Sequence, residues 1–337
     1  MNILHAGTFR DHCLDLDCIL KTGFIKNPVA YREFDYRAIS GQDGPEKMNR
    51  QLAEAAKGCD LVFIGKGELI TPSTLALIRK TGSCVAICYG DMRPIPPPWL
   101  MNNLKECDVL FLTSAGETLK SYFREGRPGR AAFFFNPSNP DLVADYADIP
   151  RSVDPPLFTG ARYRFMGEER RSVYKYLCRQ KNIQIFGSPH VYFEGDFLRR
   201  IYCTFKPVKH IRDREYIEKI IRCRLGVGVS GFQQIKYYTS NRLSDYLTFG
   251  KLYLAYHFPG CEDFFQDGVH IVYYRSVQDL DAQIKFYLRN RDLAEEIGKR
   301  GQEKMLSEYS AGKMVKMMLE IIATGRSDAF PWVEVYS

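Results

Sequence analysis

The chain has 337 residues, of which 45% are hydrophobic and 26% are charged, values that exclude intrinsic disorder and fibrous classes. This length is too great for one ordinary core and predicts two domains of roughly 100 to 200 residues each. The formal charge of +7 favours anionic partners such as nucleotide phosphates, nucleic acid or an anionic membrane surface.

Two further features bear on where the protein works. No apolar run approaches the roughly 20 residues that span a bilayer, and the N-terminal sequence MNILHAG enters a strand without a basic and apolar leader. The ten cysteines are scattered and form no CxxC pair, which favours reduced, buried thiols. We therefore expect no transmembrane segment and a cytoplasmic protein.

Short apolar runs alternate with helical patterns through the first 150 residues. Continuous apolar strands that are each followed by a helix are typical of a parallel sheet covered on both faces. The predicted strands cover residues 2–7, 60–65, 84–90, 108–113 and 131–135, and the predicted helices cover residues 46–59, 72–82, 97–107 and 116–126. Residues 1–150 are therefore predicted to form an N-terminal Rossmann-like domain.

A segment rich in proline and aspartate, residues 136–156, interrupts this alternation and is interpreted as the interdomain linker. The alternation then restarts. Predicted strands cover residues 157–160, 182–187, 224–231, 251–258 and 269–274, and predicted helices cover residues 170–181, 214–223 and 241–250, a helix start at 262–268 and a nearly continuous helical tail at 277–322. Residues 151–337 are predicted to form a second Rossmann-like domain, whose last helix is a candidate to pack back on the first.

Glycines follow several predicted strands of both domains. In open α/β sheets, ligands bind beyond the carboxyl ends of the strands, so two facing domains would form a cleft there. A glycine at such an end lets backbone amides approach a phosphate or sugar, although tight turns also need glycine. These glycines are Gly7, Gly65, Gly90, Gly160 and Gly187.

The sequence GVGVSG spells G-x-G-x-x-G at Gly226, Gly228 and Gly231. A dinucleotide fingerprint should open the first βα turn of a domain, whereas this motif lies deep in the second half. We interpret it instead as a strand with small residues where a backbone or ligand approaches closely.

Asp91 follows the predicted strand CVAICY and Gly90, at a place where a catalytic base or an acceptor-binding acid would lie. The alternative is that it caps the turn into a proline-rich loop, and the two interpretations stand about level. His5 and His12 lie near the same edge, where a lone histidine is more often a packed residue than a catalyst. No nucleophile elbow, HExxH helix, Walker loop or aspartate-rich metal loop is present, so hydrolase and metal-enzyme classes are disfavoured.

The segment SNRLSDYLTFGKLYLAYHFPGCEDFFQDGVHIVYYRS and the helical residues after it resemble the C-terminal half of GT-B glycosyltransferases. The order of an arginine, an acidic helix, a glycine, a strand and a second acidic helix is most similar to the family of the spore maturation protein CgeB. The resemblance covers roughly residues 239–322. It implies two Rossmann-like domains facing across a cleft, with an N-terminal acceptor side and a C-terminal nucleotide-sugar side.

The resemblance also implies roles for individual residues. The acid that clamps the ribose hydroxyls falls on Asp245, one methylene shorter than the usual glutamate, and Arg242 becomes the partner of the diphosphate. A second glutamate expected eight positions earlier is replaced by Tyr237. The sugar would then be held by other groups, namely Lys236, Tyr238 and the loop 258–265 that contains Glu262. Gly7, Gly160 and Gly187 complete the implied donor-binding set, and Asp91 is the implied catalytic residue on the acceptor side.

The resulting expectation is a metal-independent glycosyltransferase, retaining by family analogy, that needs no cofactor and uses a nucleotide-diphosphate sugar as co-substrate. The acceptor stays open between a polysaccharide, a protein and DNA. One rival is a phage-type enzyme that glycosylates hydroxymethylated DNA bases, and another is a non-catalytic nucleotide-sugar-binding relative. The DNA rival, or peripheral binding to an anionic membrane, is motivated by two basic clusters: Arg162, Arg164, Arg170 and Arg171, and Lys206, Lys209, Arg212 and Arg214.

Overall fold

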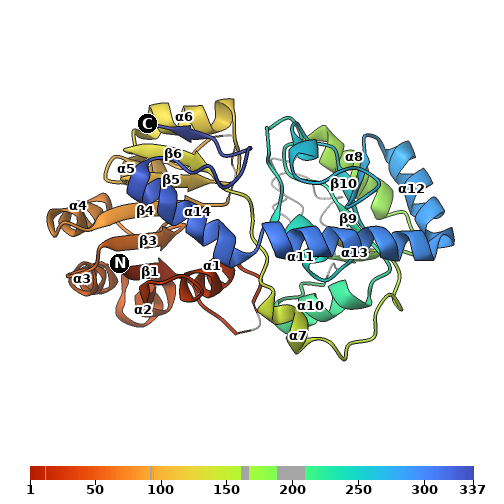
Figure 1. Cartoon of the computed structure of the whole chain (residues 1–337), viewed down its shortest axis with the longest axis horizontal. Helices are drawn as coiled ribbons and strands as arrows, with labels where there is room; N and C mark the ends of the chain where they lie inside the picture. The colour runs from red at the N-terminus through yellow and green to blue at the C-terminus, as the bar shows by residue number, and fades with distance from the viewer. Residues whose placement is uncertain (12, 92, 94, 161–166, 188–208) are drawn as a thin grey trace, which may run out of the picture. The chain divides into compact units, whose positions relative to one another are not determined.

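The computed structural model describes the whole chain except residues 12, 92, 94, 161–166 and 188–208. The described residues form two units, one made of Met1–Pro137 with Tyr309–Ser337 and the other of Ser138–Glu308. Each unit has its own sheet with helices packed against it (Figure 1). The predicted α/β class with two Rossmann-like sheets is confirmed.

The sheet of the first unit has the strand order β12-β6-β5-β4-β3-β1-β2, and only the pair of β12 with β6 is antiparallel. Its central strands are apolar and buried along their whole length, as expected for strands covered by helices on both faces. The strands are β1 (Asn2–Gly7), β2 (Ala30–Asp35), β3 (Leu61–Gly65), β4 (Cys84–Tyr89), β5 (Val109–Leu112), β6 (Arg130–Phe133) and β12 (Val335–Tyr336).

Helices follow the strands of this unit and begin at recognisable signals. In α4 (Pro72–Lys80), Pro72 occupies the first turn and the Thr71 side chain accepts a hydrogen bond from the Thr74 amide, which satisfies one of the unpaired donors at the helix start. The other helices are α1 (Leu16–Ile25), α2 (Tyr36–Asp43), α3 (Pro45–Ala55), α5 (Pro98–Leu104), α6 (Glu117–Gly126) and α14 (Ala311–Thr324).

The C-terminal helix α14 packs on α1 within the first unit. A side chain at Gly23 would lie 2.4 Å from the Ala311 carbonyl oxygen, so glycine is what permits the two helices to approach so closely. The first unit ends at Pro137, before residue 150, and it also includes the C-terminal residues from Tyr309 onward. The packing of the last helix on the first domain agrees with the expectation from the sequence, whereas the expected boundary at residue 150 falls inside the second unit.

The second unit has a five-stranded parallel sheet in the order β11-β10-β9-β7-β8. Its strands are β7 (Leu157–Thr159), β8 (Gln184–Phe186), β9 (Gly226–Gly228), β10 (Tyr253–Tyr256) and β11 (Val272–Tyr274). Its helices are α7 (Asp141–Asp145), α8 (Glu168–Leu177), α10 (Asp213–Arg222), α11 (Asn241–Thr248), α12 (Val277–Arg289) and α13 (Arg291–Glu308), with a short 3₁₀ helix η1 (Cys261–Asp263).

The structure corrects the predicted elements in five places. The elements α1, β2 and α2 were not predicted, and β2 is an edge strand with one buried residue and no apolar run. The predicted linker contains α7 and belongs to the second unit. The helical tail is three helices, α12, α13 and α14, and the predicted helix at 262–268 is only the short η1. The terminal strand β12 was not predicted.

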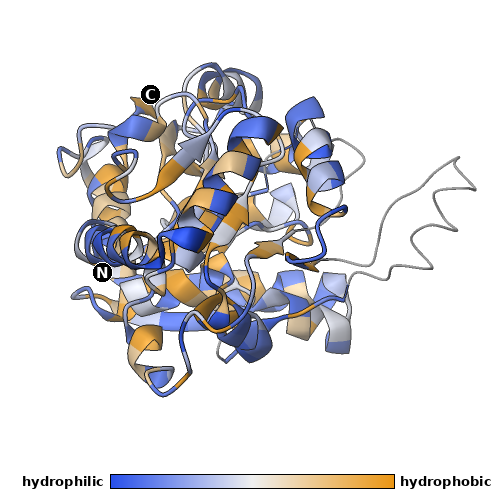
Figure 2. Ribbon diagram, turned by 90° about the vertical axis from the view of Figure 1, so that its right-hand side faces the viewer, coloured by the Kyte–Doolittle hydropathy of each residue, from blue (hydrophilic) through white to orange (hydrophobic). Residues whose placement is uncertain are grey.

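Hydrophobic residues concentrate on the strands and on the helix sides that cover them (Figure 2). In the second unit, Phe158, Val227, Leu254 and Tyr274 come from four neighbouring strands and lie in one core cluster. Burying each such side chain contributes about 1.5–3 kcal/mol to the free energy of folding. Among the helices that the structure describes, none is long and apolar enough to cross a lipid bilayer.

Candidate active site

Two arginines, one from α8 and one from α11, lie close to the glycine that follows β7. A side chain at Gly160 would lie 3.0 Å from Arg170 Nη2 and 3.5 Å from Arg242 Cζ. The Gly160 amide donates to the Phe186 carbonyl and the Gly187 amide donates to the Lys209 carbonyl, so these amides are occupied by backbone bonds. The missing side chain at Gly160, rather than its amide, is what makes room for the guanidinium groups.

Arg170 comes from α8 and is almost fully buried, with 1% of its surface exposed. Its guanidinium donates a hydrogen bond to the Val229 carbonyl oxygen just beyond β9. A buried arginine is costly unless its charge is hydrogen-bonded, so this side chain is held in one place. The sequence analysis assigned Arg170 only to a basic cluster and did not predict that it lies beside Arg242.

Asp245 lies on α11 with 4% of its surface exposed, and the Tyr216 hydroxyl of α10 donates to Asp245 Oδ2 at 2.8 Å. Burial and the nearby Asp245 charge raise the pKa of Tyr216 well above its usual value, so the hydroxyl stays a donor. Asp245 is therefore a buried, hydrogen-bonded carboxylate and not a solvated helix residue. Its hydrogen-bonded partner Tyr216 gave no signal in the sequence.

A small hollow opens at the carboxyl ends of β9 and β10, beside the first turn of α11. Tyr253 lies behind it, and burial raises the pKa of Tyr253 to about 12, with Arg242 as a neighbouring charge that opposes the rise. The hollow is lined by Gly228, Val229, Ser230, Thr239, Leu243, Tyr253, Ala255, Tyr256 and Phe258. The hollow has a volume of about 10 Å³, room for about one water molecule, and it lies at the carboxyl ends of the strands, the edge at which α/β sheets bind ligands.

The G-x-G-x-x-G sequence is explained by packing on β9. A side chain at Gly226 would lie 2.2 Å from the Tyr246 ring, and one at Gly228 would lie 1.6 Å from the Tyr253 hydroxyl oxygen. Both glycines therefore admit tyrosines from neighbouring elements, in agreement with the interpretation of a close approach.

Tyr237, which stands where the second glutamate was expected, is a packed residue with 5% of its surface exposed. Its backbone has a φ of 61°, its hydroxyl donates to Asp263, and its ring lies against Gly260 and Phe264. Tyr237 thus anchors the loop after β10.

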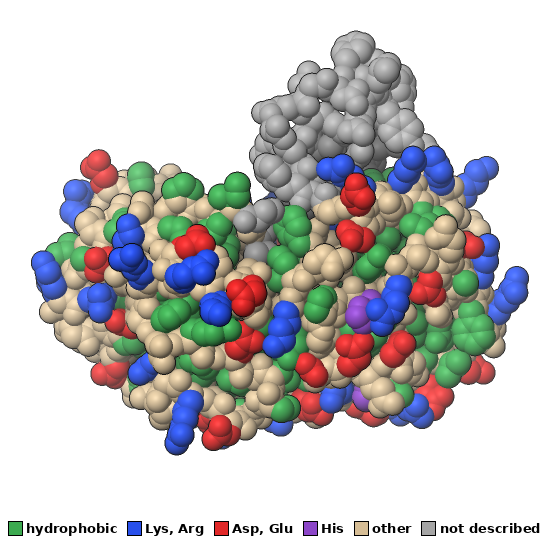
Figure 3. Space-filling view, turned by 90° about the horizontal axis from the view of Figure 1, so that it is seen from above, with side chains coloured by type: hydrophobic (Ala, Val, Ile, Leu, Met, Phe, Trp, Pro, Cys, Tyr) green, Lys and Arg blue, Asp and Glu red, His purple; other side chains and the backbone are tan. Residues whose placement is uncertain are grey.

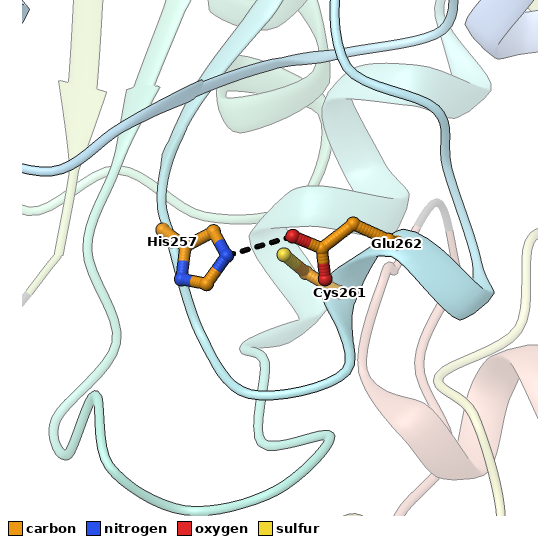
Figure 4. A group of neighbouring side chains, drawn as sticks. All are labelled: His257, Cys261 and Glu262. Atoms are coloured by element: carbon orange, nitrogen blue, oxygen red, sulfur yellow. Dashed lines mark hydrogen bonds and ion pairs between the residues drawn. The ribbon is translucent and has the colours of Figure 1, made fainter.

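The remaining donor-side candidates surround this loop. The Lys236 ammonium lies 4.6 Å from the centroid of the Tyr237 ring, and Tyr238 lies beside the Phe232 ring. Glu262 is 58% exposed and lies 2.8 Å from His257 Nε2 (Figure 4). Burial opposes ionisation of Glu262, but hydrogen bonds from its own amide, His257 and Cys261 outweigh it and lower the pKa of this carboxyl.

In the first unit, Asp91 is exposed beyond β4 and forms an ion pair of 2.5 Å with Lys66, which follows β3. Lys66 has a φ of 63°, a left-handed conformation that is uncommon for lysine and typical of functional loops. The predicted strand-end position of Asp91 is correct, and the pairing with Lys66 was not foreseen.

The other first-unit candidates lie around Asp17 at the start of α1. A side chain at Gly7 would lie 2.8 Å from the Asp17 carboxyl carbon, and the Thr8 amide donates to Asp17 at 2.9 Å. His5 is fully buried between Tyr31 and Asp17, so it is a packed residue, and His12 lies outside the described residues. Gly7 belongs to the first unit, so its place in a donor site of the second unit stays a prediction.

The basic clusters are partly neutralised. Lys209 pairs with Glu215 and Arg214 pairs with Glu218, while Arg170 is buried. Blue and red side chains alternate over the face shown in Figure 3. Arg162, Arg164 and Lys206 lie outside the described residues.

Comparison with known proteins agrees with this geometry. Residues 164–320 match the model of a family described as glycosyl transferase-like. The Anabaena protein Alr3699/HepE, solved with UDP-glucose, is 11% identical, with 96% of this chain and 100% of that chain covered and a TM-score of 0.63. A Rickettsia africae glycosyltransferase is 13% identical, with 95% and 97% covered and a TM-score of 0.60.

A sucrose-phosphate synthase from Thermosynechococcus elongatus is 16% identical, with 84% of this chain and 80% of that chain covered and a TM-score of 0.51. A search of curated proteins found no match. At these identities the likeness defines the fold, which is the GT-B fold of two Rossmann-like domains. The closer resemblance to the CgeB family stays a prediction.

Proposed function

We propose that the chain is a glycosyltransferase that takes a sugar from a nucleotide-diphosphate sugar, with UDP-sugars as the first candidates. The convergence of Arg170 and Arg242 over Gly160 carries this proposal. Two planar guanidinium groups suit the oxygens of a diphosphate, and the first turn of α11 adds the partial positive charge of a helix N-terminus. The similarity to a protein solved with UDP-glucose supports uracil as the base.

Asp245 would bind the ribose of the same nucleotide. A carboxylate can accept a hydrogen bond from each of two vicinal hydroxyls, and Asp245 lies one helical turn from Arg242 on α11. Tyr216 would fix the orientation of this carboxylate through its 2.8 Å hydrogen bond. The sugar would then extend toward Lys236, Tyr238 and Glu262.

The reaction follows from this binding mode. The bond between the anomeric carbon and the diphosphate oxygen breaks, an acceptor hydroxyl forms the new bond and loses its proton, and the nucleoside diphosphate leaves. The arginines stabilise the charge that develops on the leaving group, so we propose transfer without a metal, with retention of configuration. Asp91 is the proposed acceptor-side residue, and the acceptor stays open between polysaccharide, protein and DNA, as does attachment to an anionic surface.

Calorimetric titration with UDP, UDP-glucose, UDP-N-acetylglucosamine and GDP-mannose, each in the presence of a chelator, tests this proposal. We expect one class of site for a nucleoside diphosphate, and slow release of that diphosphate from the matching sugar nucleotide during long incubation. A chain that binds none of these ligands is not a transferase of this kind. A duplex DNA titration with a steep salt slope would identify the DNA-acceptor alternative, and insensitivity to salt would remove it.

A second candidate is a nucleotide-sugar-binding protein without turnover. Tyr237 favours it, because the residue at the expected glutamate position is buried and supports a loop instead of facing a ligand. Binding of a sugar nucleotide without transfer or hydrolysis would select this candidate.

A further inference from the structure

Three side chains that commonly bind metals meet in the loop after β10. His257 follows the strand, and Cys261 and Glu262 open η1. One ligand atom from each, an imidazole nitrogen, the Cys261 sulfur and a carboxylate oxygen, lies within 4.8 Å of the other two. Figure 4 shows the three side chains pointing toward one another.

The ligand types fit a borderline-soft divalent ion. Zinc sites use cysteine sulfur, histidine nitrogen and carboxylate oxygen, and the usual bond lengths place neighbouring tetrahedral ligands about 3.3–3.6 Å apart. His257 and Glu262, whose ligand atoms are 2.8 Å apart, would separate slightly, and the distances to the sulfur, which are at most 4.8 Å, would shorten by little more than 1 Å. Glu262, whose side chain is 58% exposed, can supply that movement by a change of rotamer.

The loop that carries these ligands is already held by its neighbours. Gly260, with a φ of +80°, lies under the Tyr237 ring, and the Tyr237 hydroxyl donates to Asp263. The Tyr273 hydroxyl donates to the Cys261 carbonyl oxygen at 3.0 Å. The backbone therefore does not have to reorganise around an ion, which reduces the entropic cost of binding.

Hydrogen bonds outside the three ligands hold the backbone around Cys261. The Tyr273 hydroxyl also lies 3.3 Å from the Phe265 carbonyl oxygen, and the Cys261 amide donates to the Phe258 carbonyl oxygen at 3.1 Å. Outer-shell hydrogen bonds help to orient the ligands of metal sites in proteins. Burial raises the pKa of the Cys261 thiol to about 12, so an ion at this position has to displace the thiol proton.

We propose that His257, Cys261 and Glu262 bind one divalent ion of the zinc class, with a fourth coordination position open to water or a small ligand. The ion would fix the loop beside the hollow that Tyr256 and Phe258 line. This metal site does not depend on the proposed transferase function, and the proposed sugar transfer does not use the ion.

The alternative is that the group is only an exposed His257–Glu262 hydrogen bond beside a buried thiol. Such a pair contributes about 0–1 kcal/mol and needs no ion. The two possibilities differ in whether the sulfur takes part in binding.

Co²⁺ titration of the chelator-treated full chain separates them, with Zn²⁺ as competitor. We expect one Co²⁺ per chain, a sulfur-to-cobalt charge-transfer band, intense visible bands of tetrahedral cobalt, and loss of these bands when Zn²⁺ is added. Cys261→Ser should abolish the charge-transfer band, and Glu262→Gln should weaken binding by at least about tenfold.

The control is a Cys13→Ser, Cys18→Ser double variant, because both thiols accept hydrogen bonds from Arg10, Cys13 from its guanidinium and Cys18 from its amide, and a neighbouring pair of thiols could also bind a soft ion. It should keep the cobalt spectrum unchanged. A wild-type chain without a charge-transfer band, or a band that survives Cys261→Ser and disappears in the double variant, would overturn the proposal. Circular dichroism of Cys261→Ser confirms that the variant folds, and nucleotide titration of the wild-type chain and of Cys261→Ser, a residue outside the proposed donor set, reports on the transferase function separately.

Discussion

Tyr216 and Asp245 form a hydrogen bond of 2.8 Å between α10 and α11, and Asp245 is 4% exposed. This bond places a carboxylate at a fixed orientation one helical turn from Arg242. We expect Asp245→Asn to weaken binding of UDP more than binding of its 2′-deoxy analogue, because only the ribonucleotide presents both hydroxyls. Calorimetry with the two nucleotides measures the difference.

Tyr216→Phe is the control for that experiment. It keeps the carboxylate but removes a charge-assisted hydrogen bond, which should lower the free energy of unfolding by about 1.5–3 kcal/mol. Equal losses for UDP and the deoxy analogue in Asp245→Asn would make Asp245 a structural partner of Tyr216 alone.

Arg242→Ala should weaken nucleoside diphosphate binding by about 1.5–3 kcal/mol, the value of a hydrogen bond to a charged group, and should leave the fold intact. Titration with UDP measures the loss. Arg171→Ala is the matched control, since Arg171 is an exposed arginine next to Arg170 on α8. Unchanged affinity in Arg242→Ala would move the phosphate site toward Lys209 or Lys206.

Much of the fold could be predicted from the sequence because its signals are local. β3 is buried at all five of its residues, and such a continuous apolar run followed by a helix defines a parallel strand by itself. β2 could not be found, because an edge strand that is mostly exposed has the composition of a loop. The packing of α14 on the first unit agrees with the expected placement of the last helix, although the helical pattern alone does not encode which sheet a helix covers.

The site was predictable to a smaller extent for the same physical reason. Arg242 and Asp245 share a helix, so their spacing is visible in the sequence. Tyr216 lies 29 residues from Asp245, and Arg170 is close to Arg242 only because β7 and α8 fold back on the sheet. Contacts between distant segments depend on the tertiary fold, and an arginine within a run of basic residues at a helix start is typical of an exposed helix face.

Asp91→Asn should lower turnover by about 10²–10⁴-fold if the carboxylate acts as a general base, with little change in donor affinity. The melting temperature should change little, because an exposed ion pair such as Asp91–Lys66 contributes about 0.2–1 kcal/mol. Steady-state kinetics and thermal unfolding measured together check both parts. Lys66→Met removes the same ion pair, so equal effects of the two variants on stability, with full turnover in Asp91→Asn, would mean that Asp91 only supports the loop.

Lys251, two residues before β10, is 3% exposed, and burial followed by the Arg151 charge lowers the pKa of Lys251 from 10.5 to about 8, with the nearby Cys223 opposing the shift. Below pH 8 the amine is protonated in both states, so the folded chain carries the full cost of a buried charge. Between pH 8 and 10.5 the unfolded chain binds more protons than the folded chain, and this contribution to stability rises with pH.

Lys251→Met should therefore raise the free energy of unfolding at pH 7 by about 1–3 kcal/mol, partly offset by loss of the Ser152 hydrogen bond. The gain should shrink toward pH 10, which denaturant unfolding at both pH values measures against the exposed-site control Lys175→Met. A gain that is independent of pH would mean that packing, rather than the buried charge, sets the effect.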